Sequence, residues 1–371
     1  MRLFMKNCPV CKSDKILSIF KHDNLPLYNL NYYNTRQEAL SAPSANVNFV
    51  KCQNCEFLFN SSYQQLDYKV EYESSRAFSK VFNKYIQRVG ATLITSLKHN
   101  IKKIVEVGAG DCHFAEVIMN LNPDLEYHAF DPSWGKSEFE GNLYKYNEYY
   151  QLQDVKPDLV VARHTLEHII DVNKFIESIT HELPKYVFIE IPCSSFVLRN
   201  NFHYFSYEHC SYFDQNSLMT LMSEFGYLPV FMNYVFNDEN IISLWSRVQH
   251  TGTTKVKLQN NASNKEFHEW KSTLVSKFQN GAVVWGAAGK GVMTVNILEQ
   301  DYNKIPYVVD KNPNIQGKFI PITGNEIISP NVLKKIKPAN IHVLNSLYLD
   351  EIISECRELD VHANIFPLFD E

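Results

Sequence analysis

The sequence has no run of apolar residues approaching the roughly 18 that a membrane-spanning helix needs. Its opening stretch, MRLFMKNCPV, is too short and too polar for a signal peptide. Runs of basic residues are also missing, and the formal net charge is −5. This charge argues against a general affinity for nucleic acid or an anionic membrane. We therefore expect a cytoplasmic protein with no nucleic-acid or membrane partner.

Cysteine is scarce, with 8 in 371 residues, but four of them are grouped. Two Cys-x-x-Cys pairs occur near the N-terminus, formed by Cys8, Cys11, Cys52 and Cys55. Two such pairs can complete a closed four-thiolate shell, which suits a structural Zn²⁺. Two disulfides, or four unrelated buried thiols, are the alternatives. The other four cysteines are scattered, as in a reducing compartment.

Strand and helix patterns alternate over most of the chain. Residues 72–97 have helical apolar spacing, and apolar strands at 102–107, 126–130, 159–163 and 185–192 alternate with helices. The polar segment 249–265 indicates a linker, and a second alternating unit follows it. Residues 1–66, around the cysteines, have few strand signals. The pattern predicts an α/β protein with a parallel sheet in each of its two larger parts.

The first glycine turn, VEVGAGDCHF, follows a buried strand. An acid, Glu106, precedes Gly108 and Gly110, and the third glycine of a dinucleotide-binding turn is missing. E-x-G-x-G after an apolar strand is the pattern of S-adenosylmethionine (SAM) methyltransferases. Asp131, at the end of the next strand, is placed to take the ribose hydroxyls of SAM. An ordinary glycine turn in an α/β protein is the alternative.

The third strand runs into the sequence ARHTLEHI. Ligands of open α/β sheets lie at the carboxyl ends of the strands, so His164 is a candidate to touch SAM or the substrate. The spacing from His164 to His168 also resembles a zinc H-x-x-E-H signature, but that signature belongs on a helix, whereas a strand precedes it here.

A second glycine turn, WGAAGKG, opens a helix near the C-terminus. Gly286 and Gly289 offer backbone N–H groups to a phosphate, and Lys290 adds a positive charge. Asp310 ends the next strand, where a Rossmann unit binds a ribose. These four residues predict a nucleotide diphosphate site, with a purely structural second domain as the alternative.

Together these motifs resemble the three-part sugar C-methyltransferases of deoxysugar pathways. The resemblance spans nearly the whole chain and is carried by the cysteines, VEVGAGDCHF, FDPS, ARHTLEHI, IEIP, YEHCSYF, WGAAGKG and VVDKNPNIQGKFIP. It implies a zinc-binding domain at 1–66, a central class I (Rossmann-like) SAM-dependent methyltransferase domain at 67–250, and a second Rossmann-like domain at 251–371 that binds the nucleotide of a nucleotide-linked sugar. A monomer or small homo-oligomer is expected.

The stretch YEHCSYF supplies the expected catalytic residues. His209 is the expected base, because histidine takes a proton near neutral pH. Glu208 or Tyr207 would orient it or bind sugar hydroxyls, and the hydroxyl of Tyr207 or Tyr72 would stabilise an enolate. The family usually has tyrosine where this chain has Ser206. The methylated atom therefore stays open between carbon and oxygen.

Two other classes of function remain as alternatives. A dinucleotide-dependent oxidoreductase would use the C-terminal glycine turn, but the first turn lacks its third glycine. A zinc-knuckle nucleic-acid binder is disfavoured by the acidic balance of the chain.

Overall fold

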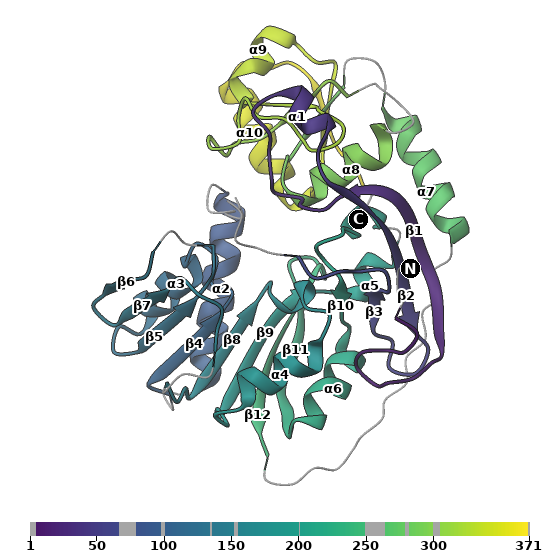
Figure 1. Ribbon diagram of the computed structural model, residues 1–371. Helices are drawn as coiled ribbons and strands as arrows, with labels where there is room; N and C mark the ends of the chain where they lie inside the picture. The colour runs from purple at the N-terminus through teal and green to yellow at the C-terminus, as the bar shows by residue number, and fades with distance from the viewer. Residues whose placement is uncertain are drawn as a thin grey trace.

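The computed structural model describes residues 5–66, 79–97, 101–133, 136–151, 155–199, 201–248, 264–278, 282–299 and 305–369. Within them the strands form three sheets, and the N-terminal sheet also includes a strand from the central part (Figure 1). The residues around the two expected domain boundaries, 67–78 and 249–263, lie outside the described part. No helix among the described residues is long and apolar enough to cross a membrane.

The central sheet has eight strands in the order β11-β12-β9-β8-β4-β5-β7-β6. Its strands are β4 (Lys103–Val107), β5 (Glu126–Phe130), β6 (Glu138–Glu140), β7 (Leu143–Tyr146), β8 (Leu159–Arg163), β9 (Tyr186–Pro192), β11 (Tyr227–Val235) and β12 (Asn240–Arg247). Strands β7, β5, β4, β8 and β9 are parallel, and β12 lies antiparallel between β9 and β11. The strand order reverses at β4 and β8, which is where an open α/β sheet binds its ligand.

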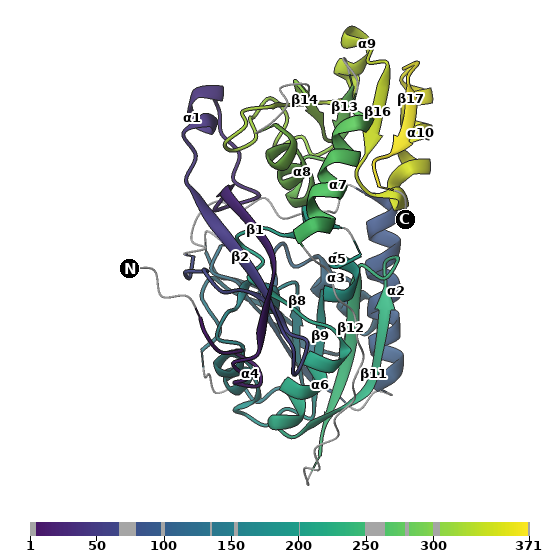
Figure 2. The same cartoon turned by 90° about the vertical axis from the view of Figure 1, so that its right-hand side faces the viewer.

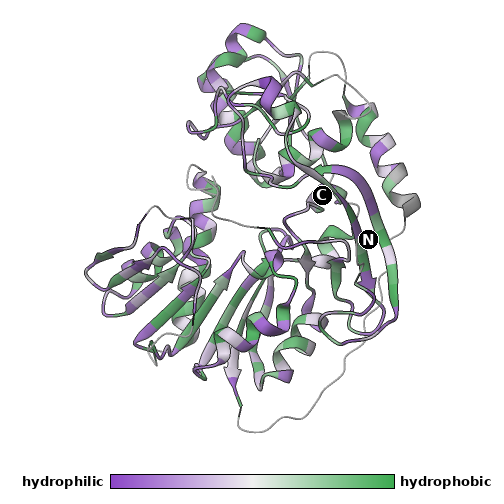
Figure 3. Ribbon diagram, in the orientation of Figure 1, coloured by the Kyte–Doolittle hydropathy of each residue, from purple (hydrophilic) through white to green (hydrophobic). Residues whose placement is uncertain are grey.

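Successive side chains of the central strands enter opposite cores, as the two-residue period of a strand requires. In β4, Ile104 lies in one core and Val105 in the other, and Val161 and Val160 of β8 divide in the same way. Apolar residues accordingly follow the central strands (Figure 3). Helices α2 (Lys80–Leu97) and α3 (His113–Leu121) cover one face, and α4 (Val172–Thr180) and α6 (Gln215–Glu224) cover the other.

The C-terminal part is a second, smaller doubly wound unit. Its parallel sheet has the order β15-β14-β13-β16-β17. The strands are β13 (Val283–Trp285), β14 (Tyr307–Val309), β15 (Glu326–Ile328), β16 (Asn340–Val343) and β17 (Asn364–Pro367). The helical segments are α7 (Asn264–Lys277), α8 (Gly289–Glu299), η3 (Pro330–Val332), α9 (Leu333–Ile336), η4 (Ser346–Tyr348) and α10 (Leu349–Glu358).

The expectation of few strands in the N-terminal part is wrong. Strands β1 (Ile16–Pro26) and β2 (Ser44–Cys52) form a long antiparallel hairpin, with α1 (Arg36–Leu40) between them. The hairpin runs from the lower half of the molecule up to the C-terminal part (Figure 2). The polar sequence of this hairpin does not indicate strands. Much of the packing of the hairpin comes from residues distant in the chain: the ring of Phe20 stacks on the ring of Phe205, with 4.8 Å between the centroids.

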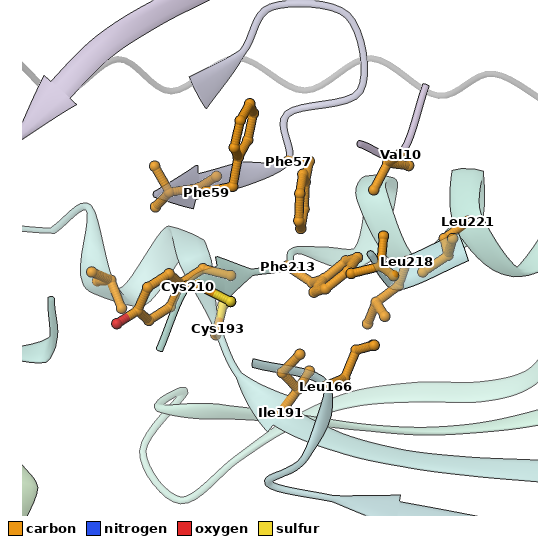
Figure 4. Close-up of a cluster of buried hydrophobic side chains, with 14 of the residues drawn as sticks. Val10, Phe57, Phe59, Leu166, Ile191, Cys193, Cys210, Phe213, Leu218 and Leu221 are labelled. Atoms are coloured by element: carbon orange, nitrogen blue, oxygen red, sulfur yellow. The ribbon is translucent and has the colours of Figure 1, made fainter. Parts of the chain in front are cut away.

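The N-terminal sheet is completed by a strand from the central part. Its order is β1-β2-β3-β10, where β3 is Leu58–Asn60 and β10 is Ser211–Tyr212. Figure 4 shows the shared core beside this strand, where Phe57 packs against Phe213 with ring centroids 4.6 Å apart. The central part of the chain also contains the short elements α5 (Ser194–Val197), η1 (Leu166–His168) and η2 (Phe202–Tyr204). The first two parts therefore fold as one body.

Candidate active site and cysteine cluster

The four paired cysteines meet at one end of the N-terminal sheet. The Sγ atoms of Cys8 and Cys55 lie 3.5 Å apart, as do those of Cys11 and Cys52, and all four lie within 4.8 Å of one another. Tetrahedral zinc with Zn–S bonds of about 2.3 Å needs sulfurs about 3.8 Å apart. The cluster therefore fits a four-thiolate Zn²⁺ site.

The two cysteine turns have the same backbone design. Lys12 and Glu56, each following the second cysteine of its pair, have φ of 61° and 67°. Their N–H groups donate to the carbonyls of Cys8 and Cys52 at 2.9 and 3.0 Å. Each turn closes on itself and points both of its thiols at the same space.

The first glycine turn lies at the carboxyl end of β4, next to Asp131. Gly108 has φ of 73°, and a Cβ there would overlap Oγ1 of Thr165, so glycine is required on both counts. The N–H of Gly110 donates to Oδ2 of Asp131 at 2.8 Å. Asp131 Oδ1 accepts from the N–H of Ser133 at 2.9 Å. The structure thus brings together the expected turn and the expected ribose-binding acid, both partly exposed at the switch point.

Glu106 lies beneath this turn and is 1 % exposed. Burial raises the pKa of its carboxyl to about 7. Tyr127 of the neighbouring strand β5 donates its hydroxyl to Glu106 Oε2 at 2.8 Å. Glu106 therefore supports the turn from inside the sheet.

His164 lies at the end of β8 and is held by two buried carboxylates. Its Nδ1 is 3.3 Å from Oε1 of Glu167, and its Nε2 is 3.2 Å from Oε1 of Glu190. Burial lowers the pKa of His164, but the charges of Glu190 and Glu167 outweigh it and the net shift is upward. The backbone φ of His164 is 49°, an uncommon value for a residue other than glycine.

Glu190, from the middle of the IEIP motif, anchors a network that the sequence did not predict. It accepts from Arg163 Nε at 2.7 Å and from the hydroxyl of Tyr85 in α2 at 2.5 Å. Burial would raise the pKa of Glu190, but Arg163 and His164 hold it well below its usual range. The signal available was the acid inside an otherwise apolar strand, which must be paired to be buried.

The expected base, His209, lies beside the loop that follows β8. One ligand-type atom each from Glu167, His168 and His209 lie within 4.8 Å of one another. The rings of His168 and His209 meet edge to face with centroids 4.9 Å apart. Strand β10, paired with β3, begins two residues after His209 and fixes this position. His209 therefore lies at the carboxyl end of β8, the strand next to β4 and its glycine turn.

The residues before His209 are tied to the N-terminal part. Glu208 is 1 % exposed, and its Oε2 accepts from the N–H of Asn29 at 2.6 Å. Burial raises the pKa of Glu208 to about 8. The hydroxyl of Tyr207 accepts from the N–H of Gln64 at 2.9 Å. Tyr72, the other expected donor, lies outside the described residues.

The second glycine turn opens α8. Gly286 has φ of 118°, and the N–H of Ala287 donates to Oδ2 of Asp310 at 2.7 Å, which parallels the pairing of Gly110 with Asp131. A Cβ added at Gly289 meets nothing within 4 Å, so this end of α8 is open. Burial raises the pKa of Asp310.

Lys290 has a partner in the central part. Its Nζ lies 2.6 Å from Oε2 of Glu239, in the turn between β11 and β12, and 4.3 Å from the ring centroid of Tyr204. Asn345 Nδ2 donates to the same Glu239 oxygen at 3.1 Å. Lys290, which the sequence predicts as a phosphate ligand, thus also joins the C-terminal part to the central part. This second role depends on Glu239, which lies 51 positions away in the chain.

The chain is similar to several solved structures, among them three methyltransferases. They are the methyltransferase domain of bacterial CtHen1 (15 % identity, 45 % of this chain and 99 % of that chain, TM-score 0.35), the plantazolicin methyltransferase BpumL with SAH (10 %, 45 % and 83 %, 0.36), and human N-acetylserotonin methyltransferase with SAM (15 %, 45 % and 55 %, 0.34). No curated protein matches the chain.

Two family models match the chain itself. Residues 74–230 match a methyltransferase domain, and residues 261–366 match a C-methyltransferase C-terminal domain. The first range contains the whole run from β4 to His209, and the second contains the second glycine turn. With the strand order and the glycine turn at its switch point, these matches identify the chain as a SAM-dependent methyltransferase of the class I fold that carries a C-methyltransferase C-terminal domain.

Proposed function

We propose that this methyltransferase methylates carbon C3 of a nucleotide-linked 4-keto-deoxysugar, with His209 as the base. One observation carries the proposal. A histidine, His209, stands beside a buried carboxylate, Glu167, at the carboxyl end of the strand next to β4 and its glycine turn, where SAM would bind, in a chain whose C-terminal domain matches that of C-methyltransferases.

SAM supplies the methyl group, as an electrophilic carbon on a sulfonium. Gly108 and Gly110 give the turn that its amino-acid end would approach, with Glu106 beneath. Asp131 would take the ribose hydroxyls, and His164 stands at the end of the next strand. The residues fit the group, because a sharp glycine turn and an acid lie at neighbouring strand ends.

His209 would remove the proton from C3 of the sugar and leave the electrons delocalised onto the 4-keto oxygen. Glu167 stabilises the imidazolium that forms, because its carboxylate lies in the same cluster. A hydroxyl from Tyr207 or Tyr72 would donate to the developing oxyanion. For Tyr207 this adds a bond to a hydroxyl that already accepts from Gln64.

The second glycine turn, at the start of α8, would bind the nucleotide diphosphate of the substrate. Gly286 and Gly289 shape the approach to α8, and Asp310 would bind a ribose. Lys290 would reach a phosphate by exchanging its bond to Glu239. The domain would thus hold the substrate by its nucleotide and present the sugar to His209.

The four-cysteine cluster would hold one structural Zn²⁺. Four thiolates leave no open position for a substrate, so the ion would act on stability. Cys52 ends strand β2, and Cys55 lies in the turn to β3, in the sheet that also includes β10, the strand after His209. A structural metal there would help to keep the base in place.

Product analysis tests the proposal. The full-length protein is incubated with SAM and a panel of 4-keto and 4-hydroxy nucleotide sugars, after thermal-shift screening with SAM, NAD and each sugar. We expect stabilisation by SAM, and a product heavier by one methylene whose new methyl group is bonded to C3. Methylation of an oxygen would overturn the carbon assignment, and stabilisation by NAD in place of SAM would overturn the cofactor assignment.

A further inference from the structure

We infer that Glu167, His168 and His209 form a second metal site, which takes a divalent first-row transition ion such as Zn²⁺ or Co²⁺ and stops the enzyme while it is bound. The site shares no residue with the cysteine cluster. Its inhibitory consequence rests on the proposed role of His209 as the base, whereas the binding itself does not.

The donor set and its spacing suit such an ion. Two imidazoles and one carboxylate bind Zn²⁺ in many catalytic sites and leave one position open. Their ligand atoms lie within 4.8 Å of one another. Tetrahedral ligands at bond lengths of about 2.0–2.2 Å are about 3.4 Å apart, so binding needs side-chain movements of about 1.4 Å or less. Side-chain torsions alone supply a movement of that size.

Glu167 has an oxygen available for a ligand. The residue is 1 % exposed, and its Oε2 finds no hydrogen-bond partner among the described residues. A buried carboxylate oxygen without a partner is costly, and a cation is the partner that offsets this cost best. The other oxygen, Oε1, is paired with Nδ1 of His164 at 3.3 Å.

The surroundings supply the outer contacts that metal ligands ordinarily have. Ligating histidines donate their second ring N–H to a carbonyl or carboxylate, and ligating carboxylates are themselves hydrogen-bonded. His168 makes a hydrogen bond to the backbone of Glu208, and Glu167 is held by His164. Two of the three ligands are therefore oriented before any ion arrives.

A bound ion and a working base exclude each other. The nitrogen lone pair of His209 that would accept the substrate proton would be donated to the metal instead. The site therefore predicts reversible inhibition by transition ions, at concentrations that leave the thiolate site filled.

Metal titration without substrate tests the binding. Protein carrying one equivalent of zinc is titrated with Co²⁺, by calorimetry and by visible absorption. We expect one further equivalent of Co²⁺ to bind. Its visible spectrum should show the weak d–d bands of Co²⁺ bound by nitrogen and oxygen, and no thiolate-to-metal charge-transfer band. Glu167→Gln and His168→Gln should each weaken this equivalent at least about tenfold. His362→Gln is the matched control, because His362 forms an exposed pair with Asp360 and should bind as wild type.

Wild-type protein supplies the second measurement, which does not depend on how the variants fold. Methyl transfer should fall as the second equivalent binds and recover when a chelator removes it. The absence of a second equivalent, its persistence in both ligand variants, or unchanged methyl transfer when it is bound would overturn the inference. A His209→Asn variant that keeps methyl transfer would instead refute the proposed base and leave the binding result standing.

Discussion

Glu208 carries a carboxyl group that folding removes from water. It is 1 % exposed, its pKa rises to about 8 because of burial, and its Oε2 accepts from the N–H of Asn29 at 2.6 Å. At neutral pH the folded protein keeps this group protonated, whereas the unfolded chain ionises it near its ordinary value of 4.5. Between pH 4.5 and about pH 8, folding is therefore coupled to the uptake of a proton by Glu208.

We predict that this group makes the folded protein less stable as the pH rises. Its contribution is fully present below about 4.5 and is lost as the pH rises through about 8. Glu208→Gln keeps the shape and the acceptor oxygen but cannot ionise. As the pH rises from 4.5 to about 8, the unfolding temperature of this variant should therefore increase relative to that of wild type. Thermal unfolding at a series of pH values measures the difference. Glu140→Gln, at an exposed position, should track wild type, and parallel curves for all three proteins would contradict the prediction.

Asp131 has one structural role and one proposed binding role, and two substitutions at this position separate them. It supports the turn through the N–H of Gly110, and we propose that it binds the ribose of SAM. Asp131→Ala should weaken SAM binding by about 1.5–3 kcal/mol, the worth of a charge-assisted hydrogen-bond pair. Asp131→Asn keeps an acceptor for Gly110 and should lose less. Calorimetry with unchanged affinity for the alanine variant would refute the assignment.

At this scale the sequence predicts the residues that belong to a motif with a fixed spacing. The two Cys-x-x-Cys pairs and the Gly108–Gly110 turn are such motifs, and the structure assembles both. No motif pairs Glu190 with Arg163 or Tyr85, which lie 27 and 105 positions from it, so these partners are not predicted. A single sequence does not show which distant residues meet outside such motifs.

At the scale of elements, the apolar strands alternating with helices predicted both parallel sheets. Strands such as β8 are buried at every position, so their signal is strong. Strand β1 was missed because its exposed and buried positions alternate irregularly. Strand β10 is only two residues long, and it exists because β3 offers it a free edge.

The pairing of β10 with β3 links the cysteine cluster to the base. We predict that Cys52→Ser lowers metal content and stability together, and lowers methyl transfer because β10 no longer holds His209. Metal analysis and thermal unfolding measure the first two effects. Cys356→Ser is the matched control, since Cys356 is equally buried but belongs to the C-terminal part. Less than half an equivalent of metal in carefully purified wild type would contradict the zinc assignment.

At the scale of the whole molecule, the three parts meet around the second glycine turn. Tyr32 donates its hydroxyl to the carbonyl of Ala287 at 3.0 Å, and Lys290 is bonded to Glu239. The turn before Glu239 has three successive residues with positive φ: Phe236, Asn237 and Asp238. Such backbone is costly outside glycine, so the surrounding contacts must maintain it.

We predict that the bond between Glu239 and Lys290 helps to dock the C-terminal part. Glu239→Gln removes the charge and keeps the shape, so hydrogen exchange should rise at 286–292 and stay unchanged in α3. The increase in exchange should be clear, because Lys290 loses the carboxylate of a largely buried ion pair. Glu138→Gln, which removes an exposed pair with Lys136, should leave both regions as in wild type. Equal exchange in all three proteins would show that docking does not depend on this bond.

The central claim is that His209 removes a proton from carbon, and solvent exchange at C3 of a 4-keto nucleotide sugar tests it most directly. The reaction is run in deuterium oxide with S-adenosylhomocysteine bound, so that no methyl transfer consumes the substrate. Wild type should exchange the C3 proton, and His209→Asn should keep its affinity for SAM but exchange roughly 10²–10⁴-fold more slowly, the usual worth of a positioned base. The exposed control His181→Asn should exchange as wild type does. Near-normal exchange by His209→Asn, or no exchange by a wild-type enzyme that still methylates this substrate, would contradict the account.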